Sequence, residues 1–305
     1  MKHFKKRTIR WVFIISLLLL LTIGYAFISY IAPALILIPY KQTAHQCIID
    51  YNVKYDTLRV ETEDQLVLFG YYVHAQTPTV LSTIICLHGK GGLKEHYIPL
   101  AEELSNRGHN VVIFDQRAHG ESEGKYCTYG YYEKRDVQSI IDTIRVRYPK
   151  TKIGVWGTSL GGAVALQAMQ VDKRIDFGIV GSTFTNLENI IYDYADRLLN
   201  IQTSLILEPA IQNAEKLANF SIDEVKPVES VKHIRQPILL MHGEADERID
   251  VAYGKTLFAN LKSEQKELIL VEGGKHNGLL AHGGAELKEK VYTFINKIVL
   301  ETEPQ

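Results

Sequence analysis

Cysteine is scarce in this chain. The 305 residues include three cysteines, Cys47, Cys86 and Cys127, with no Cys-x-x-Cys pair and no Cys/His spacing typical of a metal site. We therefore expect no bound metal and no cofactor. Cys86 lies in an apolar segment and is interpreted as a core residue. A disulfide between Cys47 and Cys127 stays an open alternative, because sequence alone does not give their separation.

The chain also lacks an excess of positive or negative side chains. Lysine and arginine number 34 against 35 aspartates and glutamates, a formal net charge of −1. This balance gives no general case for a nucleic-acid partner or an acidic one. With 46% hydrophobic residues the chain can bury a large core. We expect one domain of about 250 residues behind an N-terminal anchor.

Charged side chains are absent from Trp11 to Tyr40, directly after a basic cluster. The cluster consists of Lys2, Lys5, Lys6, Arg7 and Arg10. About 20 apolar residues cross a hydrocarbon core, so this longer run predicts a transmembrane anchor over 11–39. Pro33 and Pro39 are interpreted as marks of the helix end.

A cleaved signal peptide is the alternative, since Ala32-Pro33-Ala34 has the small residues of a cleavage site. The apolar run is longer than the usual h-region of about 7–15 residues, which favours the uncleaved anchor. Basic residues before a span tend to stay in the cytoplasm. We therefore expect a cytoplasmic N-terminus at 1–10 and a single-pass membrane protein whose domain over 50–300 is extracytoplasmic.

Strand and helix patterns alternate along most of the domain. Residues 51–73 alternate polar and apolar side chains, which indicates antiparallel strands. Buried strands are predicted at 83–87, 110–115, 152–156, 177–181, 237–241 and 268–271, and helices at 98–106, 133–148 and 286–300. This order predicts an α/β fold with a mostly parallel sheet and helices on both faces.

One segment interrupts this alternation. Residues 182–236 contain no convincing strand, and 187–199 and 209–220 have helical patterns. A plain crossover needs far fewer residues, so the segment predicts a helical lid inserted in the domain. An extra surface helical pair without a role in access is the alternative.

Ser159 lies on a predicted strand-to-helix turn, within Gly157-Thr158-Ser159-Leu160-Gly161-Gly162. Glycines on both sides leave room for a sharp reversal that lifts the serine hydroxyl off the sheet. The following helix directs its N-terminal amides and positive dipole end to the same place. Ser159 is therefore a candidate nucleophile, with an ordinary glycine-rich turn as the alternative.

A serine nucleophile needs a base and a carboxylate that orients the base. Asp246 follows the predicted strand at 237–241, and His276 follows the one at 268–271. Both therefore lie at the sheet edge where Ser159 emerges, the edge at which active sites of open α/β sheets gather. Asp250 and His282 are competing candidates that lie farther from the strand ends.

The glycine-rich turn His88-Gly89-Lys90-Gly91-Gly92 directly follows a buried strand. Such a turn presents a backbone N–H to a tetrahedral intermediate, and the residue after the nucleophile provides a second one. We expect the oxyanion hole to consist of the amides of Lys90 and Leu160. His88 is interpreted as a structural histidine, and a plain tight turn is the alternative for the glycines.

These segments together resemble the α/β-hydrolase superfamily, within the branch of monoacylglycerol lipases, lysophospholipase-like esterases and Bem46-like hydrolases. The resemblance covers roughly residues 55–300 and rests on Leu87-His88-Gly89, on 114–124, on 157–162, on 241–246 and on Gly274-Lys275-His276. It implies an eight-stranded, mostly parallel sheet with a helical cap and a triad of Ser159, Asp246 and His276. Ala118 and His119 depart from the family's usual Asp-x-Arg-Gly-x-Gly-x-Ser pattern. Leu160 stands where many lipases of this branch have Met, which leaves the acyl preference open.

The resulting hypothesis is a membrane-anchored serine hydrolase that cleaves carboxylic acyl esters, such as monoacylglycerols or lysophospholipids. A small-molecule ester and the bilayer are its expected partners, with no nucleic acid, and the oligomeric state is unknown. A peptidase, a thioesterase or an acyltransferase on the same triad is an alternative, as is a non-catalytic membrane-tethered binding module. A dehalogenase is disfavoured, because its nucleophile would be Asp where this chain has Ser159.

Overall fold

The sheet is the centre of the molecule. The computed structural model describes residues 2–300, so residue 1 of the predicted N-terminus lies outside the described residues. Eight strands follow the order β1-β2-β4-β3-β5-β6-β7-β8. The strands are β1 (Tyr55–Glu61), β2 (Val67–Val73), β3 (Ser82–Leu87), β4 (His109–Phe114), β5 (Lys152–Thr158), β6 (Phe177–Gly181), β7 (Ile238–Gly243) and β8 (Lys266–Val271). The pairs β1–β2 and β2–β4 are antiparallel, and every pair from β4 to β8 is parallel.

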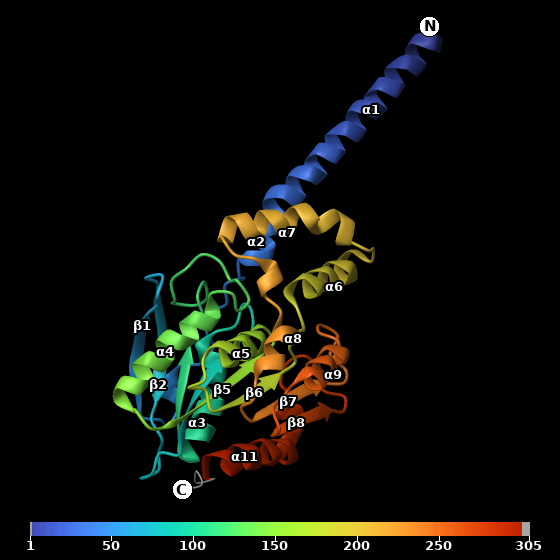
Figure 1. The fold of residues 1–305 in the computed structure, drawn as a ribbon. Helices are drawn as coiled ribbons and strands as arrows, with labels where there is room; N and C mark the ends of the chain where they lie inside the picture. The colour runs from blue at the N-terminus through green and yellow to red at the C-terminus, as the bar shows by residue number, and fades with distance from the viewer. Residues whose placement is uncertain (1, 301–305) are drawn as a thin grey trace.

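Helices cover both faces of this sheet (Figure 1). The helices of the domain are α3 (Ile98–Asn106), α4 (Glu133–Arg147), α5 (Leu160–Val171), α6 (Leu187–Leu199), α7 (Ser204–Ala218), α8 (Pro227–Ser230), α9 (Val251–Asn260), α10 (Leu279–His282) and α11 (Gly284–Leu300). Successive strand residues point to opposite faces, so Ile85 packs in a cluster with α4 and α5 while Ile84 packs in one with α3 and α11. The predicted α/β-hydrolase fold, with its mostly parallel eight-stranded sheet, is confirmed.

The predicted lid segment holds α6, α7, α8 and short 3₁₀ turns, and no strand is assigned anywhere in 182–236. α6 coincides with its prediction, but α7 begins at Ser204 instead of residue 209, so Pro209 lies inside the helix. An interior proline costs about 3 kcal/mol. Burial of Ala210, Ile211 and Ala214 against the neighbouring helices offsets this cost.

The N-terminal helix is longer than its prolines suggest. α1 (Lys2–Ala26) continues through a π-helical segment, η1 (Phe27–Ile31), into α2 (Ala32–Leu37). The prediction that Pro33 marks the helix end is therefore wrong. Pro33 stands at the start of α2, where the missing N–H is tolerated, directly after the π-helical turn. The stretch Lys6–Leu37 is the one helix among the described residues that is long and apolar enough to cross a membrane.

Candidate active site

Ser159 occupies a strained turn between β5 and α5. Its backbone has φ 58° and ψ −122°, a conformation that costs a non-glycine residue on the order of 1–3 kcal/mol. The turn is possible because the chain approaches itself closely at two glycines. A Cβ at Gly157 would lie 2.1 Å from the carbonyl oxygen of Gly161, and a Cβ at Gly161 would lie 1.9 Å from that of Leu87. Glycine is therefore required at both positions.

The loops after β7 and β8 bring Asp246 and His276 to this turn. Nε2 of His276 lies 3.0 Å from Oγ of Ser159, and Nδ1 of His276 lies 2.8 Å from Oδ2 of Asp246. Asp246 and His276 are buried, and Ser159 is half-buried. The structure thus joins the three predicted side chains in one hydrogen-bonded series.

Asp246 is held as a charged carboxylate. Its Oδ1 accepts hydrogen bonds from the backbone amides of Arg248 and Ile249, at 2.8 and 2.9 Å. Burial acts to raise the pKa of Asp246, but hydrogen bonds from His242, His276 and the Ile249 amide outweigh it and hold the pKa well below its usual range. A charged Asp246 places the proton of His276 on Nδ1, which leaves Nε2 free to accept the proton of Ser159.

His242 is a residue of this site that the sequence reasoning did not single out. Its Nε2 donates to the carbonyl oxygen of Ile249 at 2.9 Å and lies 3.5 Å from Oδ2 of Asp246. The ring is buried beneath α9, where a Cβ at Gly254 would lie 2.6 Å from its Nδ1. His242 directly precedes the segment 243–246 that carries Asp246, and this proximity was the sequence signal that could have identified it.

The two competing candidates make other hydrogen bonds. Oδ1 of Asp250 caps α9 by accepting the amide of Ala252 at 2.7 Å. His282 pairs through Nε2 with the carbonyl oxygen of Glu272 at 2.9 Å. Neither is hydrogen-bonded to Ser159 or His276.

The loop after β3 lies beside Ser159. A Cβ at Gly89 would lie 3.5 Å from Cβ of Ser159. Among residues 2–300, the amide of Lys90 donates to no protein acceptor. Leu160 is the first residue of α5, where the helix itself offers its amide no acceptor. These are the two amides that the sequence predicts for an oxyanion hole.

His88 has a structural environment. Its Nδ1 donates to the carbonyl oxygen of Gly89 at 2.8 Å, and its Nε2 accepts from the amide of Gln116 at 3.0 Å. Burial, with a smaller contribution from His119, lowers the pKa of His88 to about 3. The ring is therefore neutral and fixes the loop after β3 against the loop after β4.

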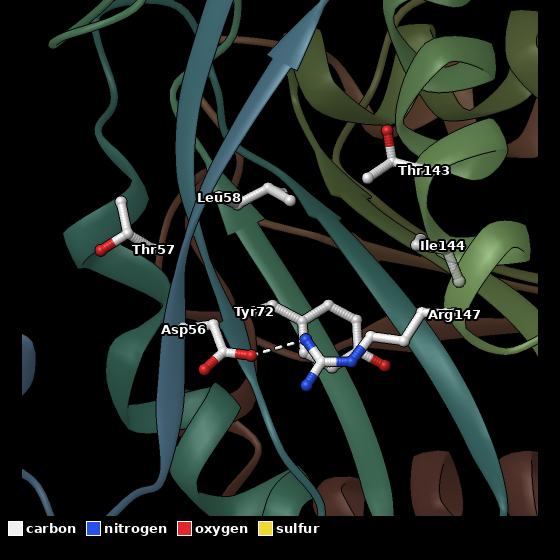
Figure 2. A pocket seen from close by; sticks show the side chains of 7 residues that line it. All are labelled: Asp56, Thr57, Leu58, Tyr72, Thr143, Ile144 and Arg147. Carbon is white, nitrogen blue, oxygen red and sulfur yellow. Dashed lines mark hydrogen bonds and ion pairs between the residues drawn. The ribbon is translucent and has the colours of Figure 1, made fainter.

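Three further features were compared with the position of Ser159, Asp246 and His276: possible metal ligands, the cysteines and a pocket. Among residues 2–300, no three His, Cys, Asp or Glu side chains are grouped so that they could hold a metal ion. Cys47 and Cys127 are free thiols, one exposed and one buried. A small pocket lies between β1, β2 and α4, where Asp56 pairs with Arg147 (Figure 2). No member of the triad lines it.

Comparison with known families identifies the chain's relatives. Residues 79–223 and 217–280 match the Hydrolase_4 family, described as serine aminopeptidase, S33. The chain belongs to this family of α/β-hydrolases. The Hydrolase_4 match spans most of the sheet, the turn at Ser159 and the loops that carry Asp246 and His276, and it confirms the resemblance expected from the sequence.

Several named proteins and a solved structure are similar to this chain. Protein bem46 of Schizosaccharomyces pombe is 26% identical over 237 residues, which is 75% of this chain and 73% of that protein. The lysophosphatidylserine lipase ABHD12 of Macaca fascicularis is 30% identical over 190 residues, 58% of this chain and 44% of that protein. The structure of the Pyrococcus furiosus esterase Pf2001 superposes with a TM-score of 0.72 at 26% identity, covering 86% of this chain and 98% of that one.

Proposed function

We propose that this protein is a membrane-anchored serine hydrolase that cleaves carboxylic esters with one lipid-like part. The observation that carries the proposal is the hydrogen-bonded series from Ser159 through His276 to Asp246. A buried carboxylate, an oriented imidazole and a serine on a strained turn are the components of acyl transfer to serine. Family membership and an esterase neighbour support the same reaction class.

In the proposed reaction, Oγ of Ser159 attacks the ester carbonyl carbon while Nε2 of His276 takes the hydroxyl proton. The amides of Lys90 and Leu160 stabilise the oxygen that becomes negative. The carbon–oxygen bond to the alcohol breaks, and His276 gives the proton to the departing alkoxide. Water then attacks the acyl-enzyme, loses its proton to His276 and releases the carboxylic acid, with the proton returned to Ser159.

A lipid-like substrate is supported by the surroundings of the site. α7 lies at the end of the molecule from which α1 projects (Figure 1). The last residues of α6 and the turn that follows expose Leu198, Leu199 and Ile201, with exposed fractions of 83%, 55% and 53%. Exposed apolar side chains favour contact with lipid or a partner, and a membrane-anchored domain has lipid within reach. A lysophosphatidylserine lipase among the relatives has a substrate of this kind.

The test is hydrolysis by the full chain in detergent, measured with p-nitrophenyl esters of graded chain length, monoacylglycerols and lysophospholipids. We expect turnover of esters and a loss of at least about 10³-fold in kcat for Ser159→Ala. Equal rates for the wild type and Ser159→Ala would overturn the proposal. An aminoacyl p-nitroanilide belongs in the panel, because the family description favours an aminopeptidase as the second candidate. Turnover of the anilide without turnover of the esters would select that candidate.

A further inference from the structure

The end of the membrane helix has backbone carbonyl groups that the helix cannot satisfy. The last turn of any helix leaves its carbonyl oxygens without helical donors. Pro33 adds to this deficit, because it has no N–H to offer the carbonyl of Ser29, four residues earlier. In this chain the hydrolase domain supplies donors from three separate segments.

The first donor comes from the lid. Nδ2 of Asn213, on α7, donates to the carbonyl oxygen of Ser29 at 2.9 Å. Ser29 and Ala32 are buried, whereas nearly all large apolar side chains from Trp11 to Phe27 are exposed. Beyond Ser29 the helix is buried on one face only, because Tyr30, Ile31 and Leu35 remain exposed. The uncharged stretch 11–28 is about 27 Å long at about 1.5 Å per residue, close to the thickness of a hydrocarbon core. The contact with Asn213 therefore lies where the span ends and the domain begins.

The second donor comes from the glycine-rich turn His88–Gly92 after β3, which we call the oxyanion loop because its Lys90 amide is one of the proposed oxyanion donors. Nζ of Lys90 donates to the carbonyl oxygens of Leu35 and Ile36, at 2.9 and 2.6 Å. The ammonium also lies 5.4 Å from the ring centroid of Tyr129. No carboxylate pairs with this ammonium among residues 2–300. The hydrogen bonds of the Lys90 ammonium therefore go to the end of the membrane helix.

The third segment is the loop before α4. The hydroxyl of Tyr129 donates to the carbonyl oxygen of Ile36 at 2.6 Å, and the amide of Cys127 donates to that of Leu37 at 2.8 Å. The side chain of Leu37 is fully buried, in one cluster with lid residues and with Ala163 of α5. The helix end is therefore enclosed between the lid and the helix that follows Ser159.

The chain after α2 also contacts the oxyanion loop. A Cβ at Gly91 would lie 2.3 Å from the ring of Tyr40. The loop that contains Lys90 is thus held by the membrane helix through its lysine side chain and by Tyr40 through its glycine. Two independent contacts to one loop make the helix end a support for the loop's backbone.

We propose that the end of the membrane helix is a structural part of the active site, and that the side chain of Lys90 is the positioning residue that joins it to the oxyanion loop. The proposal rests on the proposed function, in which the amide of Lys90 stabilises the oxyanion. The membrane helix then sets the geometry of catalysis in addition to tethering the domain. It also holds the lid at the membrane surface through Asn213.

The first test is kinetic and uses the full chain in detergent. Lys90→Met keeps the backbone amide and the length of the side chain but removes the ammonium. We expect kcat for a short soluble ester to fall at least about 10-fold with KM unchanged, because the oxyanion site acts on the transition state. Lys90→Arg restores part of kcat, and Lys290→Met, an exposed change on α11, leaves it unchanged. Wild-type kcat in Lys90→Met would overturn the proposal.

The second test needs no activity, and its deciding sample is the wild type, so it does not depend on the folding of Lys90→Met. Residues 41–47 are exposed and non-helical, so a protease site inserted there cuts the covalent link between the helix and the domain. After cleavage in detergent we expect the N-terminal helix to co-purify with a C-terminally tagged domain. The doubly substituted Lys90→Met, Asn213→Leu protein should lose it.

The two tests separate the two proposals. Release of the helix from the cleaved wild type would overturn the docking, whatever the enzyme's activity. Retention of the helix in a wild type that hydrolyses no ester would refute the proposed function while leaving the docking established.

Discussion

Nε2 of His276 lies 3.0 Å from Oγ of Ser159, although 117 positions separate the two residues in the chain. The contact depends on β5 and β8, which carry the two residues to the same edge of the sheet. Its consequence is a serine hydroxyl whose hydrogen-bond partner is a buried imidazole backed by a carboxylate. Catalysis should therefore depend on both hydrogen-bond partners of His276.

Substitution of Asp246 by Asn tests which acid orients His276. The amide that replaces the carboxylate would donate to the imidazole and favour the wrong tautomer, so we expect kcat to fall by up to about 10⁴-fold, the loss typical of this change in a serine protease triad. Asp250→Asn is the matched control, because Asp250 caps α9 instead. It should keep kcat, since Asn is as good a cap as Asp. Equal kinetic losses for the two variants would contradict the assignment.

Gly161→Ala tests the close approach that forms the turn at Ser159. The added Cβ would lie 1.9 Å from the carbonyl oxygen of Leu87, so backbone must move. We expect the free energy of unfolding to fall by about 1–3 kcal/mol, the cost typical of overpacking. Gly24→Ala meets nothing within 4 Å and lies inside α1, where Ala favours the helix, so it should not lower stability or change hydrolysis. Urea unfolding of both variants is the measurement, and wild-type stability of Gly161→Ala would refute the packing argument.

Burial of His109 should lower the free energy of unfolding in mild acid. Burial, with a smaller contribution from Arg107, lowers its pKa to about 4, and Nδ1 lies 2.8 Å from Oγ of Ser82. An unfolded histidine titrates near 6.5, so below that pH the unfolded chain binds more protons than the folded one. The contribution of His109 is complete above pH 6.5 and is lost as the pH falls towards 4. Between pH 6.5 and 5 the loss is about 1.5 kcal/mol.

His109→Asn removes this titration. Its free energy of unfolding should therefore depend less steeply on pH between 6.5 and 5 than that of the wild type. Urea unfolding at three pH values provides the comparison. Identical slopes for the two proteins would show that His109 is not responsible.

Cys47 tests the orientation in the membrane that the sequence predicts. It is an exposed free thiol that follows the membrane helix, whereas Cys86 and Cys127 are buried. With the basic residues before the span in the cytoplasm, Cys47 lies on the outer side. We expect a membrane-impermeant maleimide to label intact cells at Cys47, and Cys47→Ser to remove the signal. Labelling that appears only after lysis would reverse the orientation.

Much of the fold follows from apolar periodicity in the sequence. The predicted ranges of α3, α6 and β6 agree with the structure because each has a clear apolar pattern and a clear boundary. The start of α7 and the passage of the helix through Pro33 could not be predicted, because the burial that offsets Pro209 and the donor that replaces the missing N–H of Pro33 both come from distant segments. The pairing of Asn213 with Ser29 spans 184 positions.

Part of the candidate site could be predicted from the sequence and part could not. Strand-end positions were enough to select Ser159, Asp246 and His276, since parallel strands bring their carboxyl ends to one edge. The side chain of Lys90 carried no comparable signal. Its acceptors are backbone carbonyls of a helix that the sequence presents only as an anchor, and no residue type identifies such an acceptor.

The most direct test of the account is labelling of the full chain with a fluorophosphonate probe, followed by mass spectrometry of the modified peptide. A serine that is activated by His276 attacks the probe's phosphorus and displaces fluoride. We expect one adduct, on Ser159, that disappears in both Ser159→Ala and His276→Ala, whereas His282→Ala labels like the wild type. A folded wild-type protein that does not react, or an adduct that persists in Ser159→Ala, would contradict the claim that Ser159 is the nucleophile.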